Sequence, residues 1–304
     1  MDWTKEKVEA RKQYIGGSDA SAILGLNRFK TPLQVWAIKT GQIVPEDIND
    51  KVAVKLGNKL EQTVAEFFMD ETGKKLERVN ETLIHPKYPF LCANIDRRVV
   101  GERAGFEAKT TNQFKAREWE GNDIPIEYLI QCIHYMAVTG LPKWYIAVLI
   151  GNMEFRWKEI DRDDKVIDDL VRKEVAFWNT FVIPKVMPMQ ITSEDGGVLY
   201  ELYPQAAPES VIELGDDASK ICESLDSLKA DAKVLEKEIS EQENTLKAML
   251  GTYETGLTPV YKVSWKTQCA KRIDTEKMRK EEPGIYERFL KETTSRVLRL
   301  SVRK

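Results

Sequence analysis

The sequence predicts a mixed α/β (α+β) core followed by a long helical extension. Helix-like and strand-like segments alternate up to about residue 188, and a stretch rich in proline and glycine follows them. A heptad pattern of apolar residues then runs from 216 to 250. The 304 residues suffice for one large domain or two ordinary ones. We therefore expect a core at 1–188, a linker or irregular cover at 189–215, and an extension at 216–304 with a basic segment at 260–304.

The helices and strands of the core are expected in a clear order. Pro32 suits the first turn of a helix, and Gly73 and Gly140 suit the position just after one. Gly151-Asn152 suits the turn of a strand pair. In chain order we expect helices at 18–24, 31–40 and 50–72, strands at 79–84, 91–100 and 104–110, a helix at 126–139, strands at 144–150 and 154–160, and a helix at 161–181.

The segment 216–250 predicts one long helix that ends at Gly251. Its apolar residues are spaced alternately by four and three positions, with Gln242 in one slot of the series. This stripe either packs on its own domain or forms a coiled coil with another chain. The apolar members are Ile221, Leu225, Leu228, Ala232, Leu235, Ile239, Leu246 and Met249.

Charge and composition exclude several classes of protein. The net charge of −3 argues against a uniformly basic nucleic-acid binder. The segment MDWTKEKVEARK has no apolar stretch typical of a signal peptide, and no apolar run is long enough to span a bilayer. We therefore expect a cytoplasmic protein with no membrane partner. Four widely spaced cysteines without a CxxC pair disfavour a zinc or iron–sulfur site, and only two histidines are present. Any metal should therefore have oxygen ligands, which favours Mg²⁺ or Mn²⁺.

The small net charge combines two regions of opposite sign. Residues 260–304 carry 13 Lys/Arg and 6 Asp/Glu, whereas residues 1–259 carry 33 and 43. The tail is therefore +7 and the rest −10. Lys266 and Arg272 belong to a basic face that either contacts phosphates or is an ordinary solvated surface.

The pattern most suggestive of chemistry is Asp96 followed by Glu107-Ala108-Lys109. Asp96 is expected within a strand, and Glu107 and Lys109 should share one face of the next strand. A turn near Gly101 would bring the two carboxylates together as a hard-oxygen site, with the lysine on the same face. Taken one at a time, these residues also have simpler interpretations. Asp96 could be an ordinary carboxylate in a turn, and Glu107 and Lys109 could form a simple ion pair.

Further residues are placed to join such a site. Glu61 lies on the long helix, and Gln131 and Tyr135 lie one turn apart on a later one. Each could equally be an ordinary helix residue. Near the N-terminus, Arg11 precedes Gly16-Gly17 and a helix that Ser18 or Asp19 could cap. This arrangement is suited to phosphate or is simply a capped turn.

These motifs resemble a known family. Asp96 with Glu107-Ala108-Lys109 resembles the PD-(D/E)xK nuclease signature. The ordered blocks IGGSDASAILG, TPLQVWAIKTG, GNKLEQ, NIDR, EAKTT and QCIHYM, behind Arg11, resemble the YqaJ viral recombinase family, relatives of lambda exonuclease. They cover about residues 11–140. VSWKT and RVLRL in the tail are also similar to that family's C-terminal extension.

The resemblance implies a restriction-endonuclease-like fold, with a central mixed sheet between helices, and a phage or prophage exonuclease of a bacterial host. Such enzymes resect double-stranded DNA ends from the 5′ side, leave a 3′ single strand, and work beside a single-strand annealing protein. Many form a toroidal homotrimer. The long helix and basic tail depart from lambda exonuclease, which leaves the trimer open.

The resemblance also assigns roles to individual residues. Asp96, Glu107 and the Ala108 carbonyl would bind Mg²⁺, two ions in the active complex, and Lys109 would position the attacking water. Glu61 and Gln131 would complete the active site, and Arg11 and Ser18 would hold the 5′-phosphate. The residues expected to contact DNA are Thr110, Thr111, Tyr135, Lys266 and Arg272.

Two other functions stay open at this stage. One is a structure-selective or nicking endonuclease of the same fold, which would cut a covalently closed circle. The other is a non-catalytic DNA-binding or assembly protein, against which the presence of all three of Asp96, Glu107 and Lys109 argues.

Overall fold

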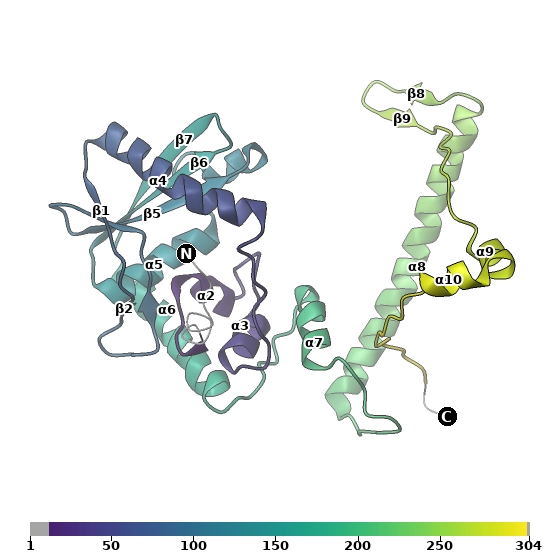
Figure 1. Ribbon diagram of the computed structural model, residues 1–304, viewed down its shortest axis with the longest axis horizontal. Coiled ribbons are helices and arrows are strands. Elements are labelled where there is room, and N and C mark those ends of the chain that lie inside the picture. Colours follow the sequence, from purple (N-terminus) through teal and green to yellow (C-terminus); the bar gives the residue numbers. More distant parts are fainter. Residues whose placement is uncertain (1–11, 303–304) are drawn as a thin grey trace. The chain divides into compact units, whose positions relative to one another are not determined.

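The computed structural model describes residues 12–302, which divide into two compact units, one ending at Tyr203 and one beginning at Pro204. The first unit is a three-layer α/β structure with a five-stranded mixed sheet at its centre (Figure 1). No helix in the described part of the chain is long and apolar enough to cross a membrane. The boundary falls after Tyr203 because residues 193–202 form helical turns that pack on the first unit, where a linker or irregular cover was expected.

The sheet has the order β1-β4-β5-β6-β7, and only β5 and β6 run parallel. β5 carries the EAKTT motif along the middle of the sheet. Trp144 of β6 lies across Gly105, where an added Cβ would come within 2.3 Å of the indole ring. The strands are β1 (Leu76–Arg78), β4 (Arg97–Val99), β5 (Ala104–Thr111), β6 (Lys143–Ile150) and β7 (Glu154–Asp161), with a separate ribbon of β2 (Leu83–Ile84) and β3 (Cys92–Ala93).

Helices cover both faces of the sheet. α4 (Val52–Thr72) lies on one face, where Phe68 packs against Phe106 and Tyr145. The larger core lies on the other face, where buried Trp144 and Ile146 of β6 pack beneath the remaining helices. Those helices include α2 (Gly17–Ile23), α3 (Pro32–Lys39), α5 (Ile126–Thr139) and α6 (Asp164–Phe177), and α6 continues as a π-helical turn, η2 (Trp178–Val182).

Local signals in the sequence account for most element ends. Thr31 caps α3 by accepting a hydrogen bond from the Gln34 amide, and Asp163 caps α6 in the same way. Gly73 and Gly140 adopt positive φ just after α4 and α5, as glycine commonly does at the end of a helix. The expected boundaries of both helices therefore agree with the structure to within two residues.

Two expected strands are wrong in detail. In place of one strand at 79–84, the structure has β1, which ends before this segment at Arg78, and β2, which includes only its last two residues, Leu83 and Ile84. The segment 91–100 is broken into β3 and β4, so Asp96 lies in a bend between them rather than within a strand. Alternation of apolar residues continues through the bend, which is why the sequence pattern did not reveal it.

A buried polar pair joins the elements beneath the sheet. His134 of α5 and Glu174 of α6 are both fully buried, and Nδ1 of the histidine lies 2.7 Å from Oε1 of the glutamate. Nε2 lies 2.8 Å from the Cys92 carbonyl oxygen, so it carries a hydrogen and donates it. Burial lowers the pKa of His134, but the neighbouring Glu174 more than offsets this, and the net pKa is raised. The pair thus fixes α5 against α6 and β3.

The second unit is organised around one helix. α8 (Asp216–Leu250) has the predicted bounds and ends at Gly251. A short ribbon of β8 (Thr255–Leu257) and β9 (Lys262–Ser264) follows, and two short helices occupy part of the tail, α9 (Thr275–Glu281) and α10 (Pro283–Arg288). The first unit also ends in two short helices, η3 (Ser193–Asp195) and α7 (Gly196–Leu202).

Candidate active site

Asp96 and Glu107 meet at the point where the β4–β5 ladder ends. The ladder pairs Arg97 with Phe106 and Arg98 with Gly105 and goes no further. Beyond it, Asp96 Oδ2 accepts a hydrogen bond from the Ala108 amide at 2.9 Å, in place of a strand partner. The amide and carbonyl of one strand residue point to the same side, so the Ala108 carbonyl also faces Asp96. The Ala108 carbonyl therefore faces the same side of β5 as the Asp96 carboxylate.

Lys109 and Glu107 lie side by side on the α5 face of β5. Lys109 Nζ donates to Glu107 Oε1 at 2.5 Å and to Gln131 Oε1 at 3.0 Å. Gln131 Nε2 in turn donates to Glu107 Oε1 at 3.0 Å and to the Tyr135 hydroxyl at 2.7 Å. The ammonium also lies 4.8 Å from the centre of the Tyr128 ring. These contacts fix the lysine between a carboxylate, an amide and an aromatic face.

The electrostatics of Asp96 and Glu107 favour a bound cation beside the two carboxylates. Burial and the nearby charge of Glu107 raise the pKa of Asp96 to about 8. Burial alone would lower the pKa of Lys109, but Glu107 and Asp96 more than offset it, so the lysine stays protonated well above neutral pH. Glu107 Oε2 is buried and accepts no hydrogen bond from any residue that the structure describes. Two close carboxylates with one unsatisfied oxygen suit a cation better than another hydrogen-bond donor.

The donor set fits a hard divalent cation. Two carboxylates and a backbone carbonyl are oxygen ligands of the kind Mg²⁺ prefers. Within residues 12–302 no group of three or more His, Cys, Asp or Glu side chains is close enough to enclose a metal alone. A cation here would therefore have to complete its coordination with water or a bound phosphate, as Mg²⁺ commonly does.

Glu61 of α4 lies near Asp96, but its carboxylate already forms an ion pair with Arg97. Its Oε1 lies 2.8 Å from Nη1 of the buried Arg97, and Gln62 Oε1 accepts from Nη2 at 2.9 Å. The charge of Glu61 contributes to the raised pKa of Asp96. The sequence interpretation missed Arg97, although it directly follows Asp96 in the NIDR block. Its signal was an arginine on the same alternating positions as the buried Ile95 and Val99.

The Gly-Gly turn packs directly against the active-site helix. An added Cβ at Gly17 would lie 2.6 Å from the Tyr135 ring and 2.9 Å from Gln131. Gly16, not Ser18, is the N-cap of α2, and Asp19 accepts from its amide at 3.2 Å. Lys30 and Lys39 pair with Asp19, and their charges hold its pKa far below the usual range although burial opposes this. Ser18 is exposed in the first turn, and Arg11 lies outside the described residues.

The residues expected to contact DNA differ in their surroundings. Thr110 and Thr111 are half-buried at the end of β5. Tyr135 is only 5% exposed, so it supports Gln131 from within the core and is not a surface contact. Lys266 and Arg272 are exposed in the second unit.

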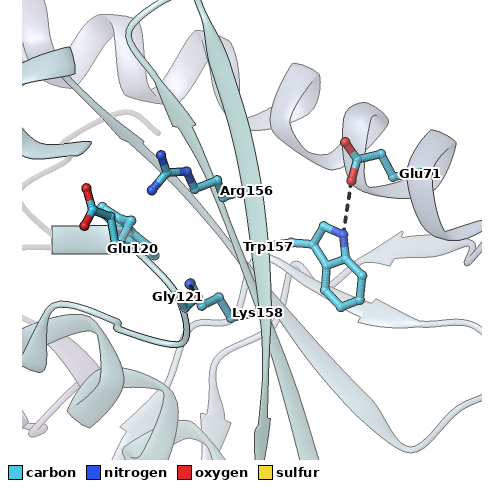
Figure 2. A pocket seen from close by; sticks show the side chains of 7 residues that line it. Glu71, Glu120, Gly121, Arg156, Trp157 and Lys158 are labelled. Carbon is cyan, nitrogen blue, oxygen red and sulfur yellow. Dashed lines mark hydrogen bonds between the residues drawn. The ribbon is translucent and has the colours of Figure 1, made fainter. Parts of the chain in front are cut away.

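A cavity of about 430 Å³ lies elsewhere, along the edge strand β7 (Figure 2). Trp157 points to one side of the strand and donates to Glu71 at 3.2 Å, whereas Arg156 and Lys158 point to the other. Among the described residues, none of the predicted site residues lines this cavity, which is formed by Glu71, Trp119, Glu120, Gly121, Arg156, Trp157 and Lys158.

The fold is similar to that of an alkaline exonuclease of known structure. The chain resembles the alkaline exonuclease LHK-Exo from Laribacter hongkongensis, with a TM-score of 0.51 and 19% identity over 60% of this chain and 94% of the other. The structure of LHK-Exo in complex with dAMP is similar to the same degree, at 20% identity.

The chain belongs to the YqaJ-like viral recombinase family. The pattern of the YqaJ-like viral recombinase domain matches residues 6–142. YqaJ of Bacillus subtilis (strain 168) is 39% identical over 290 residues, which cover 93% of this chain and 89% of that relative. The similarity thus includes the second unit as well as the sheet.

Proposed function

We propose that this protein is an Mg²⁺-dependent exonuclease that degrades double-stranded DNA from the 5′ end and leaves a 3′ single strand for annealing-based recombination. The main support is that Asp96 and Glu107 lie beside Lys109, and that Glu107 Oε2 is buried without a hydrogen-bond donor among the described residues. Membership of a viral recombinase family and the alkaline exonuclease fold support DNA as the substrate.

Asp96, Glu107 and the Ala108 carbonyl would hold the divalent cation, with Mn²⁺ as the alternative to Mg²⁺ and two ions in the active complex. When bound, the cation would polarise the scissile phosphate and stabilise the charge that develops on it. Glu61 would stay at the rim, because Arg97 holds its carboxylate.

Lys109 would act as a hydrogen-bond donor and not as a base. Its raised pKa keeps it protonated, so it can orient a water molecule and offset phosphate charge but cannot take up a proton. Gln131 would keep the ammonium in place, since it contacts both Lys109 and Glu107, and Tyr135 would hold Gln131. We assign Gln131 and Tyr135 positioning roles on this basis.

Arg11 and Ser18 would recognise a 5′-phosphate. Ser18 is exposed in the first turn of α2, and Gly17 brings that turn against the active-site helix. Two lysines neutralise Asp19, so its carboxylate need not repel an incoming phosphate. Arg11→Ala should narrow the rate difference between phosphorylated and dephosphorylated 5′ ends, and an unchanged difference would refute the pocket.

The decisive experiment is digestion of linear duplexes labelled at one end, with and without a 5′-phosphate and with and without Mg²⁺. We expect Mg²⁺-dependent release of mononucleotides from the 5′ side and an intact covalently closed circle. Cutting of the circle would identify an endonuclease of the same fold. DNA binding without cleavage in either metal would identify a non-catalytic binding or assembly protein. A single-strand annealing protein and a homo-oligomer, a trimer by analogy with the family, are the proposed partners.

A further inference from the structure

The apolar seam of α8 is largely exposed among the described residues. Six of its side chains are 43–76% exposed, although the seam continues for five heptads along the helix. An exposed heptad seam of this length is typical of a helix that pairs with another one. The exposed members are Ile221, Leu228, Leu235, Ile239, Leu246 and Met249.

Charge is segregated around this helix. With Leu225, Ala232, Ile239 and Leu246 at the a positions, the e and g positions that flank the seam carry five acidic residues and one lysine. The remaining outward positions carry four acidic residues and four lysines. The whole net charge of −4 on α8 therefore lies beside the seam. The five flanking acids are Asp217, Asp231, Glu236, Glu238 and Glu243, and the lysine is Lys229.

This pattern disfavours pairing with a second copy. In a parallel dimer each g position faces the following e position of the other helix, which places Asp231 against Glu236 and Glu238 against Glu243. In an aligned antiparallel dimer Lys229 would face Glu236, which is an attractive pair. Asp231 would face Glu238, which is a repulsive pair, so the two charge interactions would cancel. Asp231, Glu236 and Glu238 also form no ion pair among residues 12–302.

We propose that α8 is a docking helix for a different protein, whose contributing segment is an amphipathic helix with lysine or arginine flanking its apolar stripe. Burial of the seam would provide most of the affinity, because each flanking charge pair contributes little by itself. The acidic flanks would select the partner, because like charges at these positions disfavour wrong pairings.

The test uses the full chain and two synthetic 35-residue helical peptides. Both have leucine at a and d, and they differ only in lysine or glutamate at e and g. We expect the lysine-flanked peptide to bind at least about tenfold more tightly in fluorescence anisotropy, with a preference that decreases as salt increases. Equal affinity for the two peptides, or no binding of the lysine-flanked one, would overturn the proposal.

Matched variants separate the seam from general charge attraction. The triple variant Asp231→Lys, Glu236→Lys and Glu238→Lys should reverse the preference. Glu223→Lys, Asp226→Lys and Glu241→Lys make the same charge change on outward positions and should retain it. If the outward variant also reverses the preference, binding is only electrostatic and the proposal fails.

Self-association is tested directly by sedimentation. The double variant Leu228→Ser and Ile239→Ser should bind neither peptide, yet the mass of the chain alone should stay the same as that of the wild type. A lower mass in this variant would show that the seam joins copies of this chain, which would overturn the proposal. Far-UV circular dichroism of each variant verifies that α8 is still helical.

Discussion

At the residue scale, the proposed site depends on Lys109, which keeps its proton beside the Glu107 carboxylate. Lys109→Ala should lower cleavage about 100- to 1000-fold, because removing a single well-placed donor has effects of that order. DNA-end binding should persist, since it does not require this ammonium. A single-turnover cleavage assay and an end-binding assay measure the two, and exposed Lys165→Ala serves as the control. Full activity in Lys109→Ala would show that the lysine is not the hydrogen-bond donor that cleavage requires.

The raised pKa of Asp96 makes stability depend on pH. Its pKa is about 8 in the folded chain and 3.8 ordinarily, so the folded state binds an extra proton between these values. In the absence of metal, stability should therefore fall as pH rises from about 4 to about 8. Asp96→Asn lacks this titration and should melt at least about 4 °C above the wild type at pH 9 in EDTA, while being inactive. Identical pH profiles for the two proteins would contradict the cause given for the shift.

At the scale of elements, Gly17 decides how closely α2 approaches α5. Gly17→Ala should lower the free energy of unfolding by about 1–3 kcal/mol and reduce cleavage, because the new methyl would displace Tyr135 or Gln131. Gly16→Ala is the matched control, since nothing lies within 4 Å of its added Cβ and its φ is −103°. Chemical denaturation and the end-labelled duplex assay follow both variants. Equal effects of the two substitutions on stability and cleavage would show that the close approach of Gly17 to Tyr135 and Gln131 is not important.

The sequence predicted helices better than short strands. The ends of α5 and α8 follow from glycine and from apolar spacing, which are local signals. The bend at Asp96 is not local, because the Ala108 amide twelve residues away replaces a strand partner there. The same holds for Arg97, whose partners lie on α4. Family motifs marked Asp96, Glu107 and Lys109 in advance, but the contacts among them depend on how β4, β5 and α5 pack.

At the scale of the whole molecule, the core belongs almost entirely to the first unit. Apart from Leu250, the buried hydrophobic residues of the described part, 12–302, lie between Ile15 and Val198. A chain ending at Tyr203 should therefore fold, melt within about 3 °C of the full protein, and still cleave DNA in Mg²⁺. Calorimetry and the end-labelled duplex assay measure these properties. A large loss of stability would show that the second unit contributes to the fold of the first.

The order of the two units along the chain has a consequence in time. The last strand of the sheet ends at Asp161 and the first unit at Tyr203, so the second unit, Pro204–Lys304 and about 100 residues long, is synthesised after the first. At roughly 5–20 residues per second, this takes about 5–20 s, whereas small domains commonly fold in less than a second. The sheet and its carboxylates can therefore form on the ribosome before the second unit is complete. Each nascent chain can then carry a folded first unit while the residues after α8 are still being synthesised.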